Sequence, residues 1–386
     1  MKKLTILGAT GSIGTQALDI VRESTEGTFS LVALTACHNV ASLISLSLEF
    51  RPLVAVIADE SLYSVLKDGL AGSGIRTAAG REALIEAAGM EEADIVLSTL
   101  VGSAGILPTL KAIEKGKTIA LANKEVLVAA GASVMEAARK YNARIVPVDS
   151  EHSAIYQCLV GEPTPPAKLL LTASGGPFRA HSEEQLQSVT PQQALVHPRW
   201  KMGPKVTIDS STLANKGFEV IEAHHLFAIP PSKIQVVIHP ESIVHSMVEF
   251  RDGQVKALLS PPDMRYPISY ALYDGIRPPL SLPTLDWINL SLHFESPDLN
   301  RFPMLRMALE ALRVGGNTPA IFNAADAVAV HAFANGQIPF LGIANVTARV
   351  MELVPGVSST DIDTILATDH SVTEVAQSVI RNLYHA

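Results

Sequence analysis

The sequence has little cysteine and no long apolar run. Its 386 residues include only two cysteines, Cys37 and Cys158, too few for a disulfide framework. No uninterrupted apolar stretch approaches the roughly 20 residues that a membrane-spanning helix needs. Met1-Lys2-Lys3 leads directly into an apolar strand pattern, without the hydrophobic region of a signal peptide. We therefore predict a protein of the reducing cytoplasm that has no membrane partner.

Basic residues are also scarce relative to acidic ones. Lysine and arginine number 30 against 38 aspartates and glutamates, for a net charge of −8. Because binding to a phosphate backbone requires a basic surface, this balance argues against a nucleic-acid partner. It does not exclude a local basic pocket for a small phosphorylated ligand.

Length and composition predict a folded chain of several domains. With 47% hydrophobic and 18% charged residues, the chain has the composition of a globular protein. Single cores rarely grow beyond ~250–300 residues. Residues 1–150 alternate strand and helix patterns, which predicts an α/β fold with a Rossmann-like, doubly wound parallel sheet. The expected strands are Leu4–Leu7, Leu31–Ala36, Val54–Ala58, Ile95–Ser98, Thr118–Leu121 and Arg144–Val148.

The rest of the chain has a different pattern. Residues 151–277 favour an α+β domain with its own sheet, including a hairpin at Asp252-Gly253. The proline-rich residues 278–303 are typical of an extended linker. Residues 304–386 predict a helical bundle of about four segments. The expected strands of the α+β domain are Leu169–Ala173, Val206–Ile208, Gln235–Ile238, Val244–Phe250 and Val255–Leu259.

A glycine-rich loop follows the first expected strand. Glycines stand at positions 8, 11 and 14, in the run GATGSIG. Glycines here allow a tight turn and a close approach of a pyrophosphate, whose charge is stabilised by the N-terminus of the following helix. A glycine turn without a ligand is the alternative. No acidic residue follows the second expected strand in Thr35–Asn39, so the ribose site favours NADP over NAD.

Carboxylates and a lysine follow two later strands. Lys124, in the run Ala122–Glu125, can approach a ligand at the carboxyl edge of the sheet, although solvated charges at a helix start are the alternative. Asp149 and Glu151 are two residues apart, so an extended backbone would place both carboxylates on one face. Hard oxygen ligands suit Mg²⁺ or Mn²⁺. An acid-rich helix N-terminus is the alternative interpretation.

A third segment, 197–219, combines a possible lid with phosphate chemistry. The loop His197–Gly203 carries aromatic and basic side chains, which suits a lid. Ser210, Asn215 and Lys216 offer donors and a cation for a phosphate. Glu219 follows one helical turn later and is a candidate third metal ligand.

Together these segments resemble the 1-deoxy-D-xylulose 5-phosphate reductoisomerase family. The similarity spans nearly the whole chain, in the family's order. The runs that carry it are GATGSIG, LANKE, VDSEHSAIYQCL, TASGGPF, HPRWKMGPKVTIDSSTLANKGFEVIEAHHLF, HPESIVHSMVEF and PPDMRYPI.

The resemblance implies a function and a role for each matching residue. It implies an NADPH-dependent rearrangement and reduction of a sugar phosphate to 2-C-methyl-D-erythritol 4-phosphate, with one divalent cation (Mg²⁺, Mn²⁺ or Co²⁺). It also implies a homodimer, with residues 1–150 binding NADPH, 151–277 catalytic and dimerising, 278–303 a linker and 304–386 helical. The implied metal ligands are Asp149, Glu151 and Glu219, which are also implied catalytic residues together with Lys124 and His197. The implied substrate contacts are Lys124, Ser150, Glu151, Ser174, His197, Trp200, Ser210, Asn215, Lys216 and Glu219. The implied cofactor contacts are Thr10, Gly11, Ser12, Ile13, Asn39, Asn123, Glu125 and Gly203.

Some residues depart from the family's pattern or suit a structural role. Cys37 and His38 stand where the family usually has a glycine followed by a basic or small residue. We expect His239, Glu241 and His245 to be structural rather than a second metal site. Two alternative functions remain open at this point: another Rossmann NADP-dependent oxidoreductase, or a non-catalytic NADP-binding protein. The first, as a semialdehyde dehydrogenase, would need a nucleophilic cysteine, and the apolar setting of Cys158 argues against one.

Overall fold

The chain folds into two compact units. The computed structural model describes residues 1–384. The first unit consists of Met1–Val126, Val134–Ser153 and Met264–Leu280. The second unit contains the remaining described residues, 127–133, 154–263 and 281–384. The helices α6 (Glu125–Lys140) and α7 (Ser150–Leu159) each contribute residues to both units.

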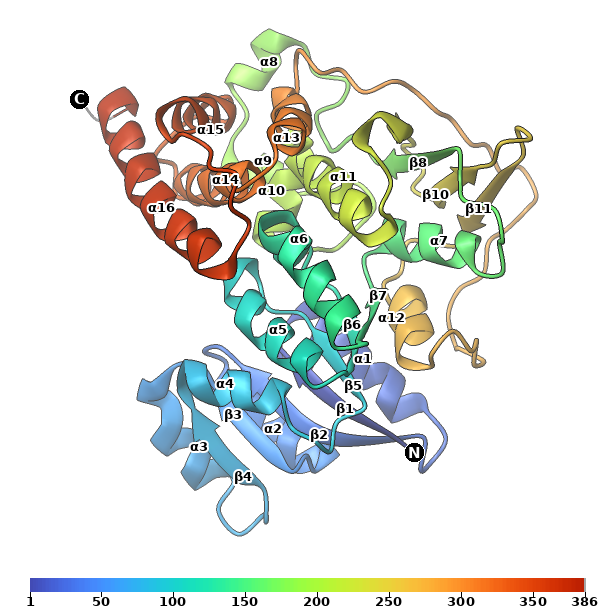
Figure 1. The fold of residues 1–386 in the computed structure, drawn as a ribbon, viewed down its shortest axis with the longest axis vertical. Helices are drawn as coiled ribbons and strands as arrows, with labels where there is room; N and C mark the ends of the chain where they lie inside the picture. Colours follow the sequence, from blue (N-terminus) through green and yellow to red (C-terminus); the bar gives the residue numbers. More distant parts are fainter. Residues whose placement is uncertain (385–386) are drawn as a thin grey trace. The chain divides into compact units, whose positions relative to one another are not determined.

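The first unit is built on a seven-stranded, all-parallel sheet of order β4-β3-β2-β1-β5-β6-β7 (Figure 1). This confirms the predicted doubly wound α/β fold. The strand order reverses between β1 and β5, and ligands of such sheets bind at the carboxyl ends of the strands beside this reversal. The strands are β1 Lys2–Leu7, β2 Phe29–Ala36, β3 Val54–Ile57, β4 Arg76–Ala79, β5 Ile95–Ser98, β6 Thr118–Leu121 and β7 Arg144–Pro147.

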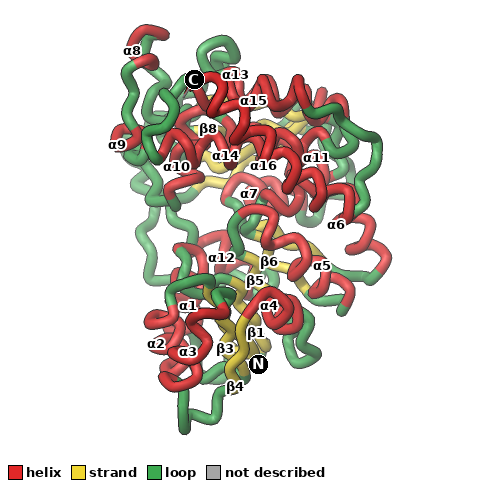
Figure 2. Tube along the Cα trace, turned by 90° about the vertical axis from the view of Figure 1, so that its left-hand side faces the viewer, coloured by secondary structure: helices red, strands yellow, loops and turns green. Residues whose placement is uncertain are grey.

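Helices cover both faces of this sheet, as Figure 2 shows. Strands buried on both faces are continuous apolar runs, which is why β3 and β5 are buried at every position. One face carries α1 (Ser12–Glu23), α2 (Val40–Phe50), α3 (Tyr63–Gly69) and α12 (Arg265–Leu272). The other carries α4 (Gly80–Ala88) and α5 (Ile106–Glu114). Short 3₁₀ turns lie at Glu60–Leu62 and Gly102–Gly105.

The second unit contains a smaller, mixed sheet of order β11-β10-β8-β9. Strands β8 (Lys168–Ala173) and β9 (Ile234–Ile238) are parallel, and β10 (Val244–Glu249) and β11 (Val255–Leu259) form the predicted hairpin, with Gly253 at φ +83°. The predicted strand Val206–Ile208 is wrong. These residues belong to α10 (Pro204–Thr212), which begins with a proline at its first turn and buries Ile208.

Helices account for most of the second unit. Four helices lie in the chain between β8 and β9. They are α8 Glu183–Gln187, α9 Pro191–Ala194, α10 and α11 Ala214–Phe227, and a 3₁₀ turn at Pro231–Lys233 follows them. The predicted C-terminal bundle is present as α13 Pro303–Val314, α14 Thr318–Ala334, α15 Gly342–Leu353 and α16 Ile362–Tyr384. A single hydrophobic core joins this bundle to α10, α11 and the sheet, and Phe218 and Phe322 meet in it at 5.3 Å between ring centroids. The bundle therefore supports the helices that carry Ser210 and Glu219.

The proline-rich segment is extended along part of its course. Glu295 forms an isolated antiparallel bridge with Ile238 of β9. The segment is also tied to the second unit by His293, whose Nδ1 lies 2.7 Å from a carboxylate oxygen of Glu241. These contacts hold the region of His293 and Glu295 against the second unit.

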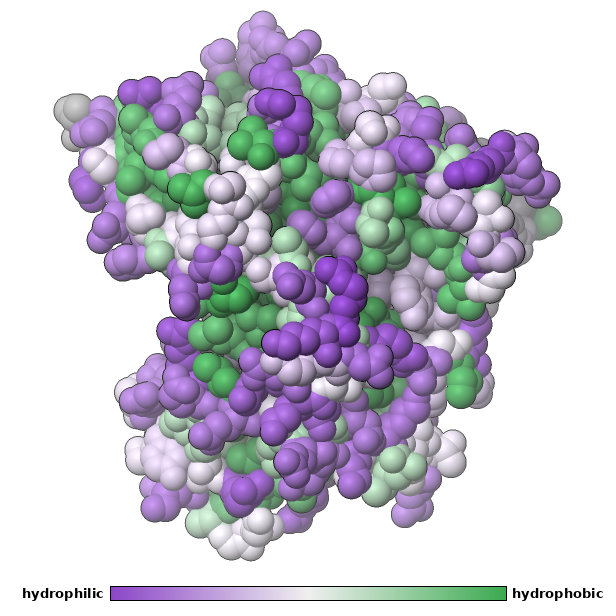
Figure 3. Space-filling model, in the orientation of Figure 1, coloured by the Kyte–Doolittle hydropathy of each residue, from purple (hydrophilic) through white to green (hydrophobic). Residues whose placement is uncertain are grey.

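Much of the surface is hydrophilic. Hydrophilic side chains cover most of the face of the first unit seen in Figure 3. In the part of the chain that the structure describes, no helix is long and apolar enough to cross a membrane.

Candidate functional site

The glycine-rich loop forms the β1–α1 turn at the carboxyl edge of the sheet. Gly8 has φ +94°, and a Cβ there would lie 2.6 Å from the Thr99 hydroxyl oxygen. A Cβ on Gly14 would lie 2.3 Å from the carbonyl oxygen of Gly8, so glycine is what allows α1 to approach the strand end. The N-terminus of α1 has no side-chain cap and no acidic residue in its first turn. Its backbone N–H groups and dipole therefore favour an anion beside Thr10, Gly11, Ser12 and Ile13.

The rim beyond β2 holds Asn39 and His38. The Asn39 side chain caps α2 by accepting from the backbone N–H of Ser42 at 3.1 Å. The Nδ1 of His38 lies 3.1 Å from a carboxylate oxygen of Asp59, a residue just beyond β3. The Ser61 hydroxyl and the His38 ring together hold the pKa of Asp59 below its ordinary value.

Three polar residues at the junction of β6 and α6 are buried. Asn123, Lys124 and Glu125 are only 3%, 8% and 7% exposed. The Nδ2 of Asn123 donates to the Gly102 carbonyl at 3.0 Å, while its buried Oδ1 has no hydrogen-bond partner among the described residues. A buried amide oxygen without a partner is costly, and it offers an acceptor to a ligand.

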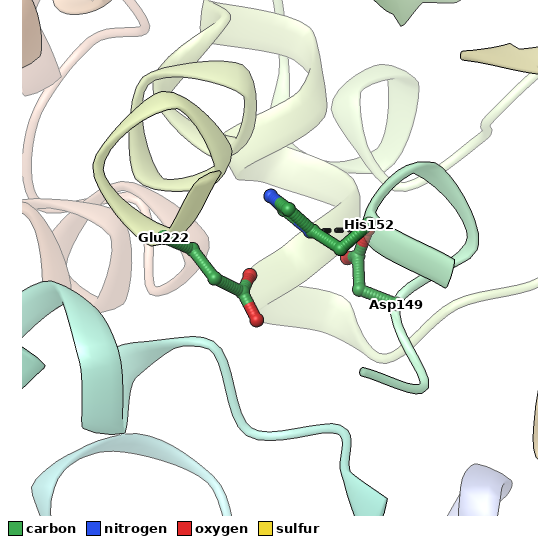
Figure 4. Close-up of side chains that lie close together, drawn as sticks. All are labelled: Asp149, His152 and Glu222. Atoms are coloured by element: carbon green, nitrogen blue, oxygen red, sulfur yellow. Dashed lines mark hydrogen bonds and ion pairs between the residues drawn. The ribbon is translucent and has the colours of Figure 1, made fainter. Parts of the chain in front are cut away.

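Asp149 is the centre of a buried polar network in the first unit. Lys124 donates to it at 2.5 Å, and the Nδ1 of His152 lies 3.1 Å from its other oxygen. Figure 4 shows His152 beside Asp149, with a dashed line for this contact. Burial is the largest influence and raises the pKa of Asp149, but Lys124 and His152 outweigh it and hold that pKa well below its ordinary value. Asp149 is therefore a carboxylate at every physiological pH.

Contrary to the prediction, Glu151 does not lie on an extended backbone. Ser150 begins α7, so Glu151 lies in the first turn of this helix, and Asp149 immediately precedes the helix. Its backbone N–H donates to Asp149 at 3.2 Å, and its carboxylate accepts from the hydroxyl of Ser150. The helix start, rather than strand alternation, brings these two carboxylates together.

Two glycines after Ser174 let this loop of the second unit approach the backbone of Ser210. Gly175 and Gly176 follow Ser174 with φ of +81° and +70°. A Cβ on Gly176 would lie 2.7 Å from the Ser210 carbonyl oxygen, so only glycine permits this approach to α10. The Ser174 hydroxyl oxygen lies 2.9 Å from the Nε2 of His197.

The loop before α10 is organised by His197. Its Nδ1 accepts from the backbone N–H groups of Arg199, at 3.2 Å, and Trp200, at 2.9 Å. An accepting Nδ1 places the proton on Nε2, which then donates to Ser174. The Trp200 ring lies 6.0 Å from the ring of His245, and Gly203 is the N-cap of α10.

Asn215, Lys216 and Glu219 occupy the first two turns of α11. The Nδ2 of Asn215 donates to one carboxylate oxygen of Glu219 at 2.6 Å, and the ammonium of Lys216 donates to the other. Lys216 is 4% exposed and Glu219 is 1% exposed. Leu213, just before this helix, is buried in the left-handed region at φ +63°, which fixes the turn between α10 and α11.

Two buried residues of the predicted site segments were missed. His152 lies one turn after Asp149 on α7, and the (i, i+3) spacing at a helix start is the signal that could have found it. Glu222 lies on α11 one turn after Glu219 and is fully buried. Its (i, i+3) spacing from Glu219 in a predicted helix is the signal that would have placed both side chains on one face.

The histidines expected to be structural have structural contacts. The Nε2 of His239 accepts from the backbone N–H of Val244 at 3.1 Å, and its Nδ1 contacts the His293 carbonyl at 2.9 Å. The Nε2 of His245 lies 2.7 Å from the Ser260 hydroxyl. Cys158 is buried in α7, and burial raises the pKa of its thiol. That thiol is a poor nucleophile.

Three family models match successive parts of the chain. Residues 4–131 match 1-deoxy-D-xylulose 5-phosphate reductoisomerase, residues 145–227 its C-terminal domain, and residues 259–375 the DXP reductoisomerase C-terminal domain. The chain is 48% identical over 379 residues to the 1-deoxy-D-xylulose 5-phosphate reductoisomerase of Porphyromonas gingivalis, covering 98% of each. It is 48% identical over 381 residues to that of Bacteroides fragilis, covering 98% of each.

Solved structures show the same similarity. The enzyme of Zymomonas mobilis in complex with NADPH superposes with a TM-score of 0.91 at 41% identity, covering 98% of each chain. A DOX-P reductoisomerase in complex with NADPH, fosmidomycin and magnesium gives a TM-score of 0.93 at 39% identity, covering 99% of each.

Proposed function

This chain belongs to the 1-deoxy-D-xylulose 5-phosphate reductoisomerase family, and we propose that it rearranges and reduces 1-deoxy-D-xylulose 5-phosphate to 2-C-methyl-D-erythritol 4-phosphate. The reaction uses NADPH and one divalent cation and supplies isoprenoid precursors. The observation that carries the proposal is the presence on one chain of two features: a nucleotide-binding β1–α1 turn, and a buried set of carboxylates, lysines and hydroxyls.

The nucleotide turn of the first unit fits NADPH. The uncapped N-terminus of α1 suits a pyrophosphate, and the buried Oδ1 of Asn123 offers an acceptor. NADPH would supply the hydride. We propose cofactor contacts at Thr10, Gly11, Ser12, Ile13, Asn39, Asn123, Glu125 and Gly203.

The carboxylates fit a hard divalent cation. We propose Asp149, Glu151 and Glu219 as the ligands of Mg²⁺, Mn²⁺ or Co²⁺, because all three offer oxygen donors and Asp149 is held ionised. A cation held there would act as a Lewis acid on the carbonyl and hydroxyl oxygens of the substrate. Ser150 lies beside Glu151 and can hydrogen-bond a substrate hydroxyl.

The remaining polar residues suit the two ends of the substrate. Lys124, buried and charged, can orient the reacting oxygens and stabilise negative charge that develops on them. Ser174, Ser210, Asn215 and Lys216 provide donors for the phosphate. His197 and Trp200 lie on the loop that would close over it and exclude water from the aldehyde formed before reduction.

An absorbance assay tests this function directly. Incubating the protein with NADPH, Mg²⁺ and 1-deoxy-D-xylulose 5-phosphate should consume NADPH, and adding EDTA should stop the reaction. Oxidation of NADPH that persists in EDTA would point instead to another Rossmann oxidoreductase. NADPH binding without turnover under any of these conditions would point to a non-catalytic cofactor-binding protein.

We also propose a homodimer, a cytoplasmic location and domain boundaries after residues 150, 277 and 303. The edge strand β11 of the second sheet is exposed, with Val255 47% accessible, and an unpaired apolar edge favours pairing with a second copy. Both cysteines are free thiols, which supports a reducing compartment such as the cytoplasm. Sedimentation equilibrium tests the dimer, cell fractionation tests the location, and limited proteolysis tests the boundaries.

A further inference from the structure

Both carboxylate oxygens of Glu219 are engaged by two residues at the start of α11. Asn215 donates to Oε1 at 2.6 Å, and Lys216 donates to Oε2. All three belong to the second unit, on one helix, and Lys216 and Glu219 are almost completely buried. Under the proposed function, Glu219 is a metal ligand, whereas Asn215 and Lys216 are phosphate ligands. The two sites therefore share one carboxylate.

We infer that the substrate phosphate and the divalent cation bind cooperatively, with Lys216 as the element that couples them. This inference rests on the proposed function and deepens it. A cation that binds Glu219 has to share the carboxylate with the Lys216 ammonium, and the two positive charges repel each other in a buried setting. The Lys216 ammonium therefore weakens the binding of the metal when no anion is present.

A phosphate changes this balance. It accepts hydrogen bonds from Lys216 and Asn215, so it draws both donors from the carboxylate and neutralises the ammonium. The carboxylate oxygens of Glu219 are then free of these two donors and can bind the cation. By thermodynamic linkage, the cation must strengthen phosphate binding by the same factor.

The first unit holds a second buried pair of a lysine and a proposed metal ligand. Lys124 donates to Asp149 at 2.5 Å, and both side chains are only 10% exposed. A lysine thus accompanies one proposed metal ligand in each unit. The consequence for the enzyme is that the cation would be held tightly mainly when a phosphorylated substrate is also bound.

Mn²⁺ binding measured by electron paramagnetic resonance tests the inference without turnover. Metal-free protein is titrated with Mn²⁺, with and without saturating inorganic phosphate, and a protein-free titration corrects for Mn²⁺–phosphate complexes. We expect phosphate to lower the dissociation constant for Mn²⁺ by roughly 5- to 150-fold, the usual range for coupled sites. Lys216→Met should bind Mn²⁺ more tightly than the wild type without phosphate and should lose the phosphate effect.

Two further variants make the outcome unambiguous. Lys216→Gln retains a hydrogen-bond donor without the charge and should behave like Lys216→Met, which guards against a folding defect in the latter. Lys233→Met removes an exposed lysine of the same unit and should keep the wild-type coupling. An unchanged phosphate effect in both Lys216 variants, or none in the wild type, would overturn the inference.

Glu219→Gln separates this inference from the function on which it rests. If the variant binds Mn²⁺ as the wild type does, Glu219 is not a ligand, and both the metal-site assignment and the coupling are wrong. If it loses Mn²⁺ but phosphate leaves the wild-type affinity unchanged, only the coupling is wrong.

Discussion

The Nδ1 of His38 lies 3.1 Å from a carboxylate oxygen of Asp59, at the rim where β2 and β3 end. In doubly wound folds this rim faces the ribose of the dinucleotide, and a 2′-phosphate there needs a cation or strong donors. Asp59 fixes the orientation of the His38 ring, whose side chain is 75% exposed and can contact a 2′-phosphate. His38→Ala should therefore weaken NADPH binding several-fold and leave NADH binding nearly unchanged, as measured by nicotinamide fluorescence.

A matched measurement with both cofactors gives this prediction its control. Equal weakening of NADPH and NADH binding in His38→Ala would mean that His38 acts only on the local fold.

Glu219 is expected to be required for turnover but not for cofactor binding. Glu219→Gln keeps the shape of the side chain and removes the charge that a cation needs, so turnover should fall by orders of magnitude. NADPH affinity, measured by isothermal titration calorimetry, should stay near normal because the nucleotide turn lies in the other unit. The exposed Glu183→Gln is a matched control. Unchanged turnover at limiting Mg²⁺ would exclude Glu219 as a ligand.

Trp200 offers a test of the loop, because the chain has only one other tryptophan. Truncation to alanine removes the ring near His245, so the loop should close less well, raising KM or lowering kcat. Trp287→Ala, which removes a residue that is 67% exposed, should leave both constants unchanged. Intact kinetics in Trp200→Ala would remove this loop from the catalytic cycle.

The strand and helix pattern was predictable where burial is complete. Strands such as β5 are short apolar runs, and the sequence predicts them correctly. Strand β4 was missed because Arg76–Ala79 is an edge strand without a β-branched run. Val206–Ile208 was misassigned because its β-branched residues favour strands, whereas Pro204 and core packing of Ile208 select a helix.

The candidate residues could be identified from the sequence, but their contacts could not. Nothing in the spacing shows that Lys216 and Asn215 both donate to Glu219, since that depends on side-chain rotamers within a buried helix. The pairing of Lys124 with Asp149 joins residues 25 positions apart and needs the parallel arrangement of β6 and β7. Tertiary structure decides these contacts.

A buried histidine should make stability depend on pH. Burial, with a smaller contribution from His224, lowers the pKa of His225 from 6.5 to about 4. A Cβ on Gly131 of α6 would lie 2.2 Å from the His225 ring, so the ring is packed where a protonated form cannot be hydrated. The unfolded chain, with an ordinary pKa, has no such restriction.

The sign of the effect follows from the two pKa values. Between pH 6.5 and about 4 the unfolded state binds more protons than the folded state, so stability is complete above pH 6.5 and falls as the pH drops through this window. At 1.36 kcal/mol per unit, the loss is about 3 kcal/mol at most. Urea unfolding at pH 7 and pH 5 should show the loss in the wild type and in the exposed control His370→Gln. His225→Gln cannot be protonated in this range, so its stability should change less between the two pH values. Parallel changes in all three proteins would show that His225 is not the group responsible.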